Sequence, residues 1–411
     1  MAQWQKVMLG MVLGMAFGFF LPYEAIKFEF LGTIFVHLIK MVTVPMIFFT
    51  IIYGITSFES HRGLYRISVK AISTFLITAA FAVTIGLVCS TIIQPGINDG
   101  DSRMVEMLQN AQNNFSGSNN KKDLLTILLG IIPTNIFSSF AEGNILHVIL
   151  FAILLGVVMN SKRDQCEGII SICHQAAQLM FKMIEMVMKI APIGVFGYMA
   201  ALVGSEGLDV ILILGKLIIT IFVGCFVQYI FFGVLLIVWG RLSPLPFYKK
   251  IIGPQLIALS TSSSKATLVP MMKVVENEMG VSRQSSRFLL PLSSALNMDG
   301  GAIYQASCAI FFSQLLGIQL AWVDYATLIV LCTIASIGGA GIPGGVLLFL
   351  GMVLTSIGVP IEGVLLIASI DRILDMATTV INVTGDACVT VLIDRSEGTL
   401  NQKTYNARST N

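Results

Sequence analysis

Eight apolar runs, each long enough to cross a lipid bilayer, dominate this sequence and restrict what it can fold into. They span residues 7–22, 28–56, 67–93, 124–159, 177–203, 209–239, 288–320 and 363–393. About 20 apolar residues suffice for one helical crossing of the hydrocarbon core. Lipid offers no hydrogen-bonding partner to a backbone group, so each run should satisfy its backbone as a helix. The runs therefore predict an all-α polytopic membrane protein with eight transmembrane helices.

The composition and the distribution of charge agree with this fold class. Of the 411 residues, 55% are hydrophobic and 12% are charged, whereas about 25% charged residues is typical of soluble domains. A net charge of +2 and the absence of a Lys/Arg block argue against nucleic-acid binding. Basic residues such as Lys249 and Arg283 occupy alternate connections, and acidic residues such as Asp209 and Asp324 occupy the others. The positive-inside rule then predicts that both termini are cytoplasmic and that the chain lies in the cell (inner) membrane.

Two apolar segments are interrupted by small residues and are predicted to be re-entrant helical hairpins. Residues 251–272 are interrupted by a Ser-rich stretch at 260–265, and residues 328–354 are interrupted by a Gly-rich stretch at 336–345. Non-helical backbone at membrane depth is tolerated only beside protein or a water-lined cavity. Hairpin followed by span, twice over and in opposite orientations, is the inverted-repeat layout of secondary transporters. The alternatives are a flexible serine-rich loop and a glycine-rich helix kink.

One polar stripe lies inside the last apolar run. Asp375, Thr379, Asn382 and Asp386 are spaced by four, three and four residues, so a helix turns all four toward one side. A carboxylate at the centre of a membrane-spanning helix costs about 2.5–3.5 kcal/mol even on a lenient scale. Two carboxylates on one face therefore imply a cation, an amine or water opposite them. We expect half of a solute and ion site here.

Four motifs together identify a family. They are Ser262-Ser263-Ser264, Asn297-Met298-Asp299-Gly300, the Gly-rich run at 336–345, and the stretch DMATTVINVTGD at 375–386. The second of them interrupts the seventh apolar run, so Asn-x-Asp-Gly should break its helix and free backbone carbonyls. In this order the four motifs resemble the dicarboxylate/amino acid:cation symporter family, which includes glutamate transporters and neutral amino acid exchangers. The resemblance covers nearly the whole chain.

The resemblance implies a homotrimer that works by an elevator mechanism. A static scaffold would comprise residues 1–66 and 124–207. The moving transport domain would comprise residues 208–400 together with the third span in 67–123, which also contains an external loop. Residues 401–411 would form a cytoplasmic tail.

The resemblance also implies sites for up to three cations. The implied residues are Asp386 with Ser293, Asn297 and Asn382; Asp299 with Asn297 and Thr78; and backbone carbonyls around Ala295, Ser336, Ile337 and Gly339. Hard cations such as sodium prefer oxygen ligands, so sodium ions are the expected coupling ions, and protons remain an alternative. The chain departs from the family pattern at Phe75 and Ala79, where relatives commonly carry hydroxyl groups.

For an amino acid substrate, the resemblance assigns the two charged ends to different residues. Asp375 would meet the ammonium group, and Thr379 and Asn382 would donate to the α-carboxylate. Main-chain groups of Ser263 and Ile342 would close over the substrate. The alternative for Asp375 is a local ion pair with Arg372, three residues earlier.

Thr378 is the departure that bears on selectivity. Acidic amino acid carriers of this family usually have an arginine here, and an unpaired substrate carboxylate in a dry pocket is penalised by several kcal/mol. We therefore expect an amino acid with a neutral side chain. The alternative is an acidic amino acid or C4-dicarboxylate carrier that uses Lys265 or Arg372 as its basic group. A channel-like or sensing protein is a second alternative, and no hydrolytic or redox centre that would indicate an enzyme is visible.

Overall fold

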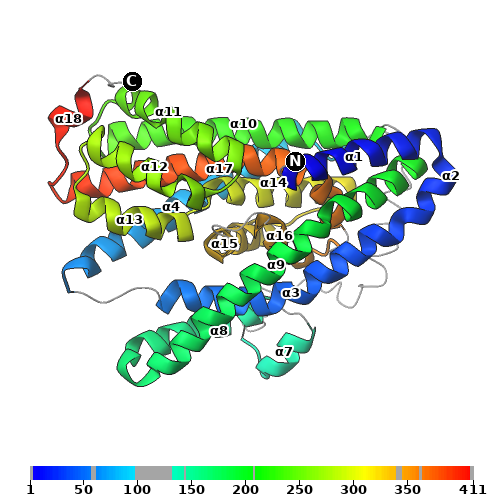
Figure 1. Ribbon diagram of the computed structural model, residues 1–411, viewed down its shortest axis with the longest axis horizontal. Helices are drawn as coiled ribbons and strands as arrows, with labels where there is room; N and C mark the ends of the chain where they lie inside the picture. Colours follow the sequence, from blue (N-terminus) through cyan, green and yellow to red (C-terminus); the bar gives the residue numbers. More distant parts are fainter. Residues whose placement is uncertain are drawn as a thin grey trace.

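The computed structural model describes residues 3–56, 62–97, 132–142, 145–206, 209–338, 345–360 and 363–407, and every regular element in these ranges is a helix (Figure 1). The first half contains α1 (Gln3–Phe20), α2 (Pro22–Ala25), a 3-10 turn (Ile26–Phe28), α3 (Glu29–Thr56), α4 (Arg62–Ile93), α7 (Ile136–Glu142), α8 (Ile145–Ser161) and α9 (Arg163–Glu206). The second half contains α10 (Asp209–Val238), α11 (Pro244–Thr261), α12 (Ser264–Asn277), α13 (Arg283–Leu296), α14 (Asp299–Leu315), α15 (Trp322–Gly338), α16 (Gly345–Ser356), α17 (Gly363–Ser396) and α18 (Gln402–Asn406). The all-helical prediction is confirmed for the described part of the chain.

Three of the described helices are long and apolar enough to cross a membrane. They contain the segments Val69–Ile93, Leu212–Val238 and Leu366–Ser396. Two other predicted spans have different bounds in the structure. The described part of the run at 124–159 contains two helices, α7 and α8, and α9, which includes the predicted fifth span, begins at Arg163, well before the predicted residue 177. At 44 residues, α9 is about 66 Å long, which exceeds the thickness of the hydrocarbon core.

Both interrupted segments form pairs of helices that pack against each other, as the sequence predicted. Helix α11 ends at Thr261 and α12 begins at Ser264. Between them, Ser262 adopts a left-handed conformation with φ of 48°, and the Ser263 hydroxyl caps α12 by accepting a hydrogen bond from the Ala266 amide at 3.2 Å. The second pair is α15 and α16, whose connection at 339–344 lies outside the described residues.

The helices pack as two groups. Helices α1, α3, α8 and α9 pack against one another, and α4 packs with the helices from α10 to α17 around α14 and α17. Figure 1 shows α10, α17 and α14 running side by side, while α9 crosses the view obliquely with α3 packed along it. Contacts between the groups are sparser and involve mainly α17, α15 and α10 against α9, α1 and α3.

Within the first group, α1 packs against the backbone of α9. Gly10 and Gly18 flank Gly14 at intervals of four residues, so the three lie on one face. A Cβ atom at Gly14 would lie 2.5 Å from the carbonyl oxygen of Phe196, and one at Gly10 would lie 2.4 Å from that of Pro192. Small residues let membrane helices approach this closely.

The end of the chain is part of the second group. The Lys250 side chain is 5% exposed, and its ammonium group donates to the carbonyl oxygens of Glu278 at 2.9 Å, Thr404 at 3.0 Å and Tyr405 at 2.7 Å. Residues 401–407, which belong to the predicted cytoplasmic tail, therefore contact the start of the first hairpin, where Lys250 lies in α11. Residues 408–411 lie outside the described part.

Candidate functional site

Helix α17 carries the predicted polar stripe on one buried face. Asp375, Thr379, Asn382 and Asp386 are all buried, and the helix packs against α14, α13 and both halves of the first hairpin. The spacing in the sequence predicted that the four would share a face. Tertiary packing adds the partners that the carboxylates meet.

The break between α13 and α14 lies against this stripe. Asn297 leaves the helical conformation with φ of −101° and ψ of 107°, because the chain must turn before α14 begins at Asp299. The Asn297 amide donates to the Asp386 carboxylate at 3.2 Å. The Gly300 backbone N–H donates to the side-chain oxygen of Asn382 at 2.8 Å. The helix break predicted from Asn-x-Asp-Gly is thus confirmed, and its amide groups hold the two polar residues of α17 in place.

Glycine at position 300 is required by the approach of α14 to α17. A Cβ atom there would lie 2.3 Å from the carbonyl oxygen of Thr378. The Thr378 hydroxyl donates within its own helix, to the Asp375 carbonyl oxygen at 3.3 Å. Thr378 is therefore fully buried against the start of α14.

Asp299 is fully buried and only partly hydrogen-bonded. One carboxylate oxygen accepts from the Gln228 amide at 3.2 Å. Its other oxygen, and the side-chain oxygen of Gln228, have no hydrogen-bond partner among the described residues. Thr78 lies beside this group, and its hydroxyl points to the Asn297 side-chain oxygen at 3.5 Å. Buried acceptors normally find a partner, so these oxygens form an acceptor set that suits a hard cation.

Gln228 was missed by the sequence analysis, although a signal was available. It is the only Asn or Gln in α10, a helix whose central residues are otherwise almost all apolar. A lone amide at that depth calls for a partner, and Asp299 is that partner.

A small cavity of about 10 Å³ adjoins Asp386 and includes Ser264, Thr267 and Ser294 among its lining residues. This is about the smallest volume that can hold one water molecule. The tip of the first hairpin therefore reaches the carboxylate. Ser293, one residue from this lining, donates its hydroxyl to the Leu290 carbonyl oxygen at 3.1 Å, and its own carbonyl oxygen accepts from the Asn297 backbone N–H at 2.7 Å.

The third predicted cation set is only partly described. Ala295 lies in the last turn of α13, and Ser336 and Ile337 lie in the last turn of α15. Ser336 is buried and donates its hydroxyl to the Thr333 carbonyl oxygen at 2.7 Å. Gly339, like the predicted substrate residue Ile342, lies outside the described residues, so this part of the site stays a prediction.

A second acidic residue and a basic residue accompany Asp375. Asp371, one turn earlier, accepts a hydrogen bond from the Tyr304 hydroxyl at 2.8 Å. Arg372 approaches the Asp375 carboxylate at 3.8 Å and donates to the Thr261 carbonyl oxygen at the end of α11 at 3.3 Å. The Arg372–Asp375 ion pair considered from the sequence is therefore present, but its nitrogen–oxygen distance is too long for a hydrogen bond. Lys265, in contrast, is an exposed residue in the first turn of α12.

Carboxylates and amides buried at a helix break, inside an apolar helical protein with paired hairpins, define an ion-coupled membrane transporter. The sequence profile of the sodium:dicarboxylate symporter family matches residues 4–396, and the chain belongs to this family. The resemblance inferred from the four motifs is confirmed. As a member, the chain is a cation-coupled symporter and an integral membrane protein.

Three relatives illustrate the match. The chain is 32% identical to a proton/glutamate-aspartate symporter of Escherichia coli over 97% of its own length and 94% of the relative. It is 31% identical to a proton/sodium-glutamate symport protein of Bacillus subtilis, covering 96% of this chain and 93% of the relative. A C4-dicarboxylate transport protein of Edwardsiella ictaluri is also 31% identical, over 98% of this chain and 94% of the relative.

Proposed function

We propose that this chain transports an acidic amino acid or a C4-dicarboxylate, driven by sodium ions or protons. The support comes from the relatives, whose names specify glutamate, aspartate or C4-dicarboxylates. The neutral amino acid expected from Thr378 finds no support among them. That expectation assumed that the basic group must lie at one position of α17, and other positions can supply it.

The position of Arg372 is the observation that supports an acidic substrate. Its guanidinium group lies between Asp375 and Thr261, the last residue of α11 at the tip of the first hairpin. Its Nε atom is buried without a hydrogen-bond partner among the described residues. A guanidinium has five N–H donors and binds a carboxylate in a bidentate manner. Arg372 therefore has donors to offer to a second substrate carboxylate.

The remaining roles follow the sequence-based assignment. Asp375 would bind the ammonium group, and the Asn382 amide group would donate to the α-carboxylate, because its oxygen is already engaged by Gly300. Thr379 would add a hydroxyl donor, and backbone groups of Ser263 and Ile342 would cover the substrate. Asp375 favours an acidic amino acid over a C4-dicarboxylate, because only the amino acid brings a positive charge to neutralise it.

Two acidic residues would bind the coupling cations. Asp386 has the Asn297 amide and the small cavity beside it, and Asp299 has the side-chain oxygen of Gln228. Sodium suits these oxygen ligands. A proton carried by Asp299 is the second candidate, because the relatives include proton-coupled symporters.

The transport cycle would use the two packing groups as separate bodies. Helices α1, α3, α8 and α9, within 1–66 and 124–207, would form the scaffold of a homotrimer. The second group, from 208–400 together with α4, would carry the substrate across the membrane. The sparse contacts between the groups support this proposal, since a moving body requires an interface that can slide.

Calorimetric titration of the purified protein tests the proposal. In sodium buffer, L-aspartate or L-glutamate should bind more tightly than L-serine, and succinate more weakly than either acidic amino acid. Arg372→Gln should weaken the binding of acidic substrates by about tenfold or more, because one hydrogen bond to a charged group is lost. The same substitution should change serine binding little. Arg283→Gln, at an exposed arginine paired loosely with Glu276 at 3.9 Å, is the matched control. Tighter binding of serine than of aspartate, glutamate and succinate by the parent protein would contradict the proposal.

A further inference from the structure

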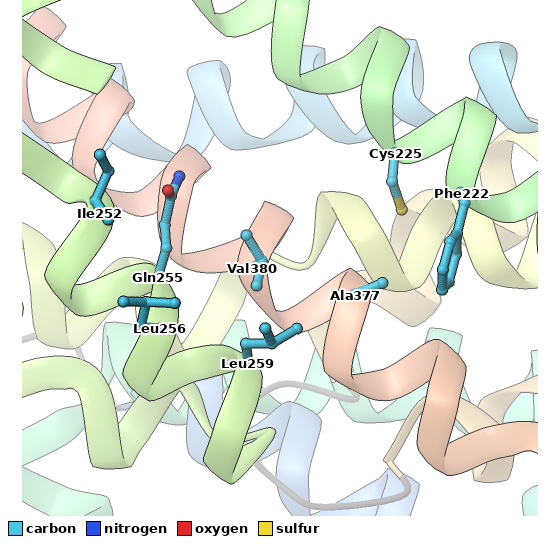
Figure 2. Close-up of a pocket in the computed structure, with 8 residues that line it drawn as sticks. All are labelled: Phe222, Cys225, Ile252, Gln255, Leu256, Leu259, Ala377 and Val380. Atoms are coloured by element: carbon cyan, nitrogen blue, oxygen red, sulfur yellow. The ribbon is translucent and has the colours of Figure 1, made fainter. Parts of the chain in front are cut away.

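A second cavity lies on the face of α17 opposite the polar stripe. It has a volume of about 370 Å³ and lies between α10, α11 and α17 (Figure 2). Its lining consists of Phe222, Cys225, Ile252, Gln255, Leu256, Leu259, Ala377 and Val380. Ala377 and Val380 directly flank the buried residues Thr378 and Thr379 in α17, so the cavity touches the back of the helix that carries the site.

The lining is apolar except for one amide. Gln255 donates to the Thr384 hydroxyl at 2.9 Å and to the Tyr229 hydroxyl at 3.2 Å, so both of its N–H groups are engaged. None of the eight lining residues is charged. An apolar cavity stays dry and accepts apolar ligands, and this one carries no charge that would recognise an ionic group.

The cavity opens toward the bilayer. Helix α10 contains one of the apolar membrane-crossing segments, Leu212–Val238, and its exposed face continues from Phe222 at the cavity to Phe226, which is 64% exposed. On the other side of the opening, Leu256 of α11 is 60% exposed. The opening is therefore continuous with the lipid-facing surface of α10, and hydrocarbon is the medium at its mouth.

We propose that an acyl chain of a membrane lipid occupies this cavity. The volume lies in the range of small-molecule sites, which is about 300–1,000 Å³, and a flexible hydrocarbon chain can enter sideways from the bilayer while its headgroup stays at the interface. The bound chain fills the space between α10, α11 and the back of α17. It thereby supports the binding helix from behind and links the lipid environment to the first hairpin. This site is independent of which solute the protein carries.

Photo-crosslinking tests the site. The protein is reconstituted in phosphatidylcholine vesicles that contain a phosphatidylcholine with a diazirine on its acyl chain, and adducts are mapped by mass spectrometry. We expect adducts on Val380 at the floor of the cavity, in addition to adducts on the exposed residue Phe226. Ala377→Trp should fill the cavity and reduce the Val380 adduct severalfold, whereas the Phe226 adduct should persist. The control, Val234→Trp, places the same bulk on the exposed face of α10 outside the cavity and should leave the Val380 adduct unchanged.

Adducts on Phe226 without any on Val380 would overturn the proposal, as would a Val380 adduct that survives Ala377→Trp. A second measurement needs no bulky substitution. In the parent protein, a charged, water-soluble diazirine should label exposed residues but give no adduct on Val380. A Val380 adduct from this charged reagent would mean that water fills the cavity and would likewise overturn the proposal.

Discussion

Gln228 and Asp299 show how one residue pair in the membrane interior can prepare an ion site. The amide donates to one carboxylate oxygen at 3.2 Å, and the other oxygen has no hydrogen-bond partner among the described residues, so it would be available to a cation in the proposed site. Phe75 and Ala79 offer no hydroxyl group where the family resemblance led us to expect one, and the side-chain oxygen of Gln228 would supply an acceptor instead. A buried carboxylate with incomplete hydrogen bonding is costly, and a bound cation offsets that cost.

Gln228→Leu tests this role. Loss of the amide removes a hydrogen bond to a charged group, which is worth about 1.5–3 kcal/mol, and also removes one oxygen ligand. The sodium concentration required for half-maximal substrate binding should rise about tenfold or more. Substrate affinity at fixed sodium should fall in parallel, since coupling between sites is reciprocal.

Thr220→Val provides the control for this measurement. Thr220 is a buried residue of the same helix, and its hydroxyl donates a hydrogen bond to the Lys216 carbonyl oxygen, one turn earlier, at 2.8 Å. Unaltered sodium dependence in Gln228→Leu would remove the amide from the ion site.

For single residues, the sequence predicted which side chains share a helix face better than it predicted which groups those side chains contact. The four-residue spacings placed Asp375 and Asp386 on one face because helical periodicity is local. The substrate's basic partner was left open by the sequence, which offered Lys265 and Arg372 as alternatives. The absence of an arginine at Thr378 suggested a neutral substrate, whereas the fold places the Arg372 guanidinium 3.8 Å from the Asp375 carboxylate, where we propose that it meets an acidic substrate.

At the scale of helices, the contact of α1 with α9 depends on glycines that a single methyl group would disturb. In Gly14→Ala, the new Cβ atom would lie 2.5 Å from the Phe196 carbonyl oxygen, so the helices must separate. Overpacking of this kind typically costs about 1–3 kcal/mol. The melting temperature of the detergent-solubilised protein should fall. Gly215→Ala, where nothing lies within 4 Å of the added atom, should not lower it, and equal melting temperatures for the two variants would contradict the proposed packing.

A second prediction for the helices concerns the contact of residues 401–407 with the first hairpin. Lys250→Met removes three hydrogen bonds to carbonyl oxygens. Hydrogen exchange should accelerate at the Tyr405 and Ala407 amides, which are bonded within the segment, because the segment detaches from the hairpin. Lys249→Met, at a neighbouring exposed lysine, serves as the control. Slow exchange in Lys250→Met would show that the segment is held by other contacts.

The helices illustrate what sequence patterns can and cannot predict. The break after Leu296 was predicted because Asn and Gly interrupt an apolar run. The separation of α7 from α8 was not, because the run at 124–159 is apolar as a whole, and its overall hydropathy outweighs the interruption Glu142-Gly143-Asn144 at the junction of the two helices. The role of Lys250 was equally hidden, since two of its three partners are backbone carbonyls 154 and 155 residues away and leave no side-chain signal.

For the whole molecule, the distribution of contacts separates the helices that hold the site from those around α9. The site residues of the described part lie on α4, α10 and the helices from α11 to α17. The cavity behind α17 lies within this same group. Substrate, cations and an acyl chain would therefore all contact one body, which can move as a unit only if the sparse contacts with α1, α3 and α9 exchange during transport.

Uptake by proteoliposomes tests the central claim most directly, namely that the chain couples a cation gradient to the transport of an acidic solute. Vesicles containing the purified protein are given radiolabelled L-aspartate, L-glutamate, succinate or L-serine under an inward sodium gradient, an inward proton gradient, or neither. The account predicts uptake of an acidic solute that requires one of the gradients, exceeds serine uptake, and falls in Arg372→Gln but not in Arg283→Gln. Gradient-driven uptake of serine without that of any acidic solute would contradict it.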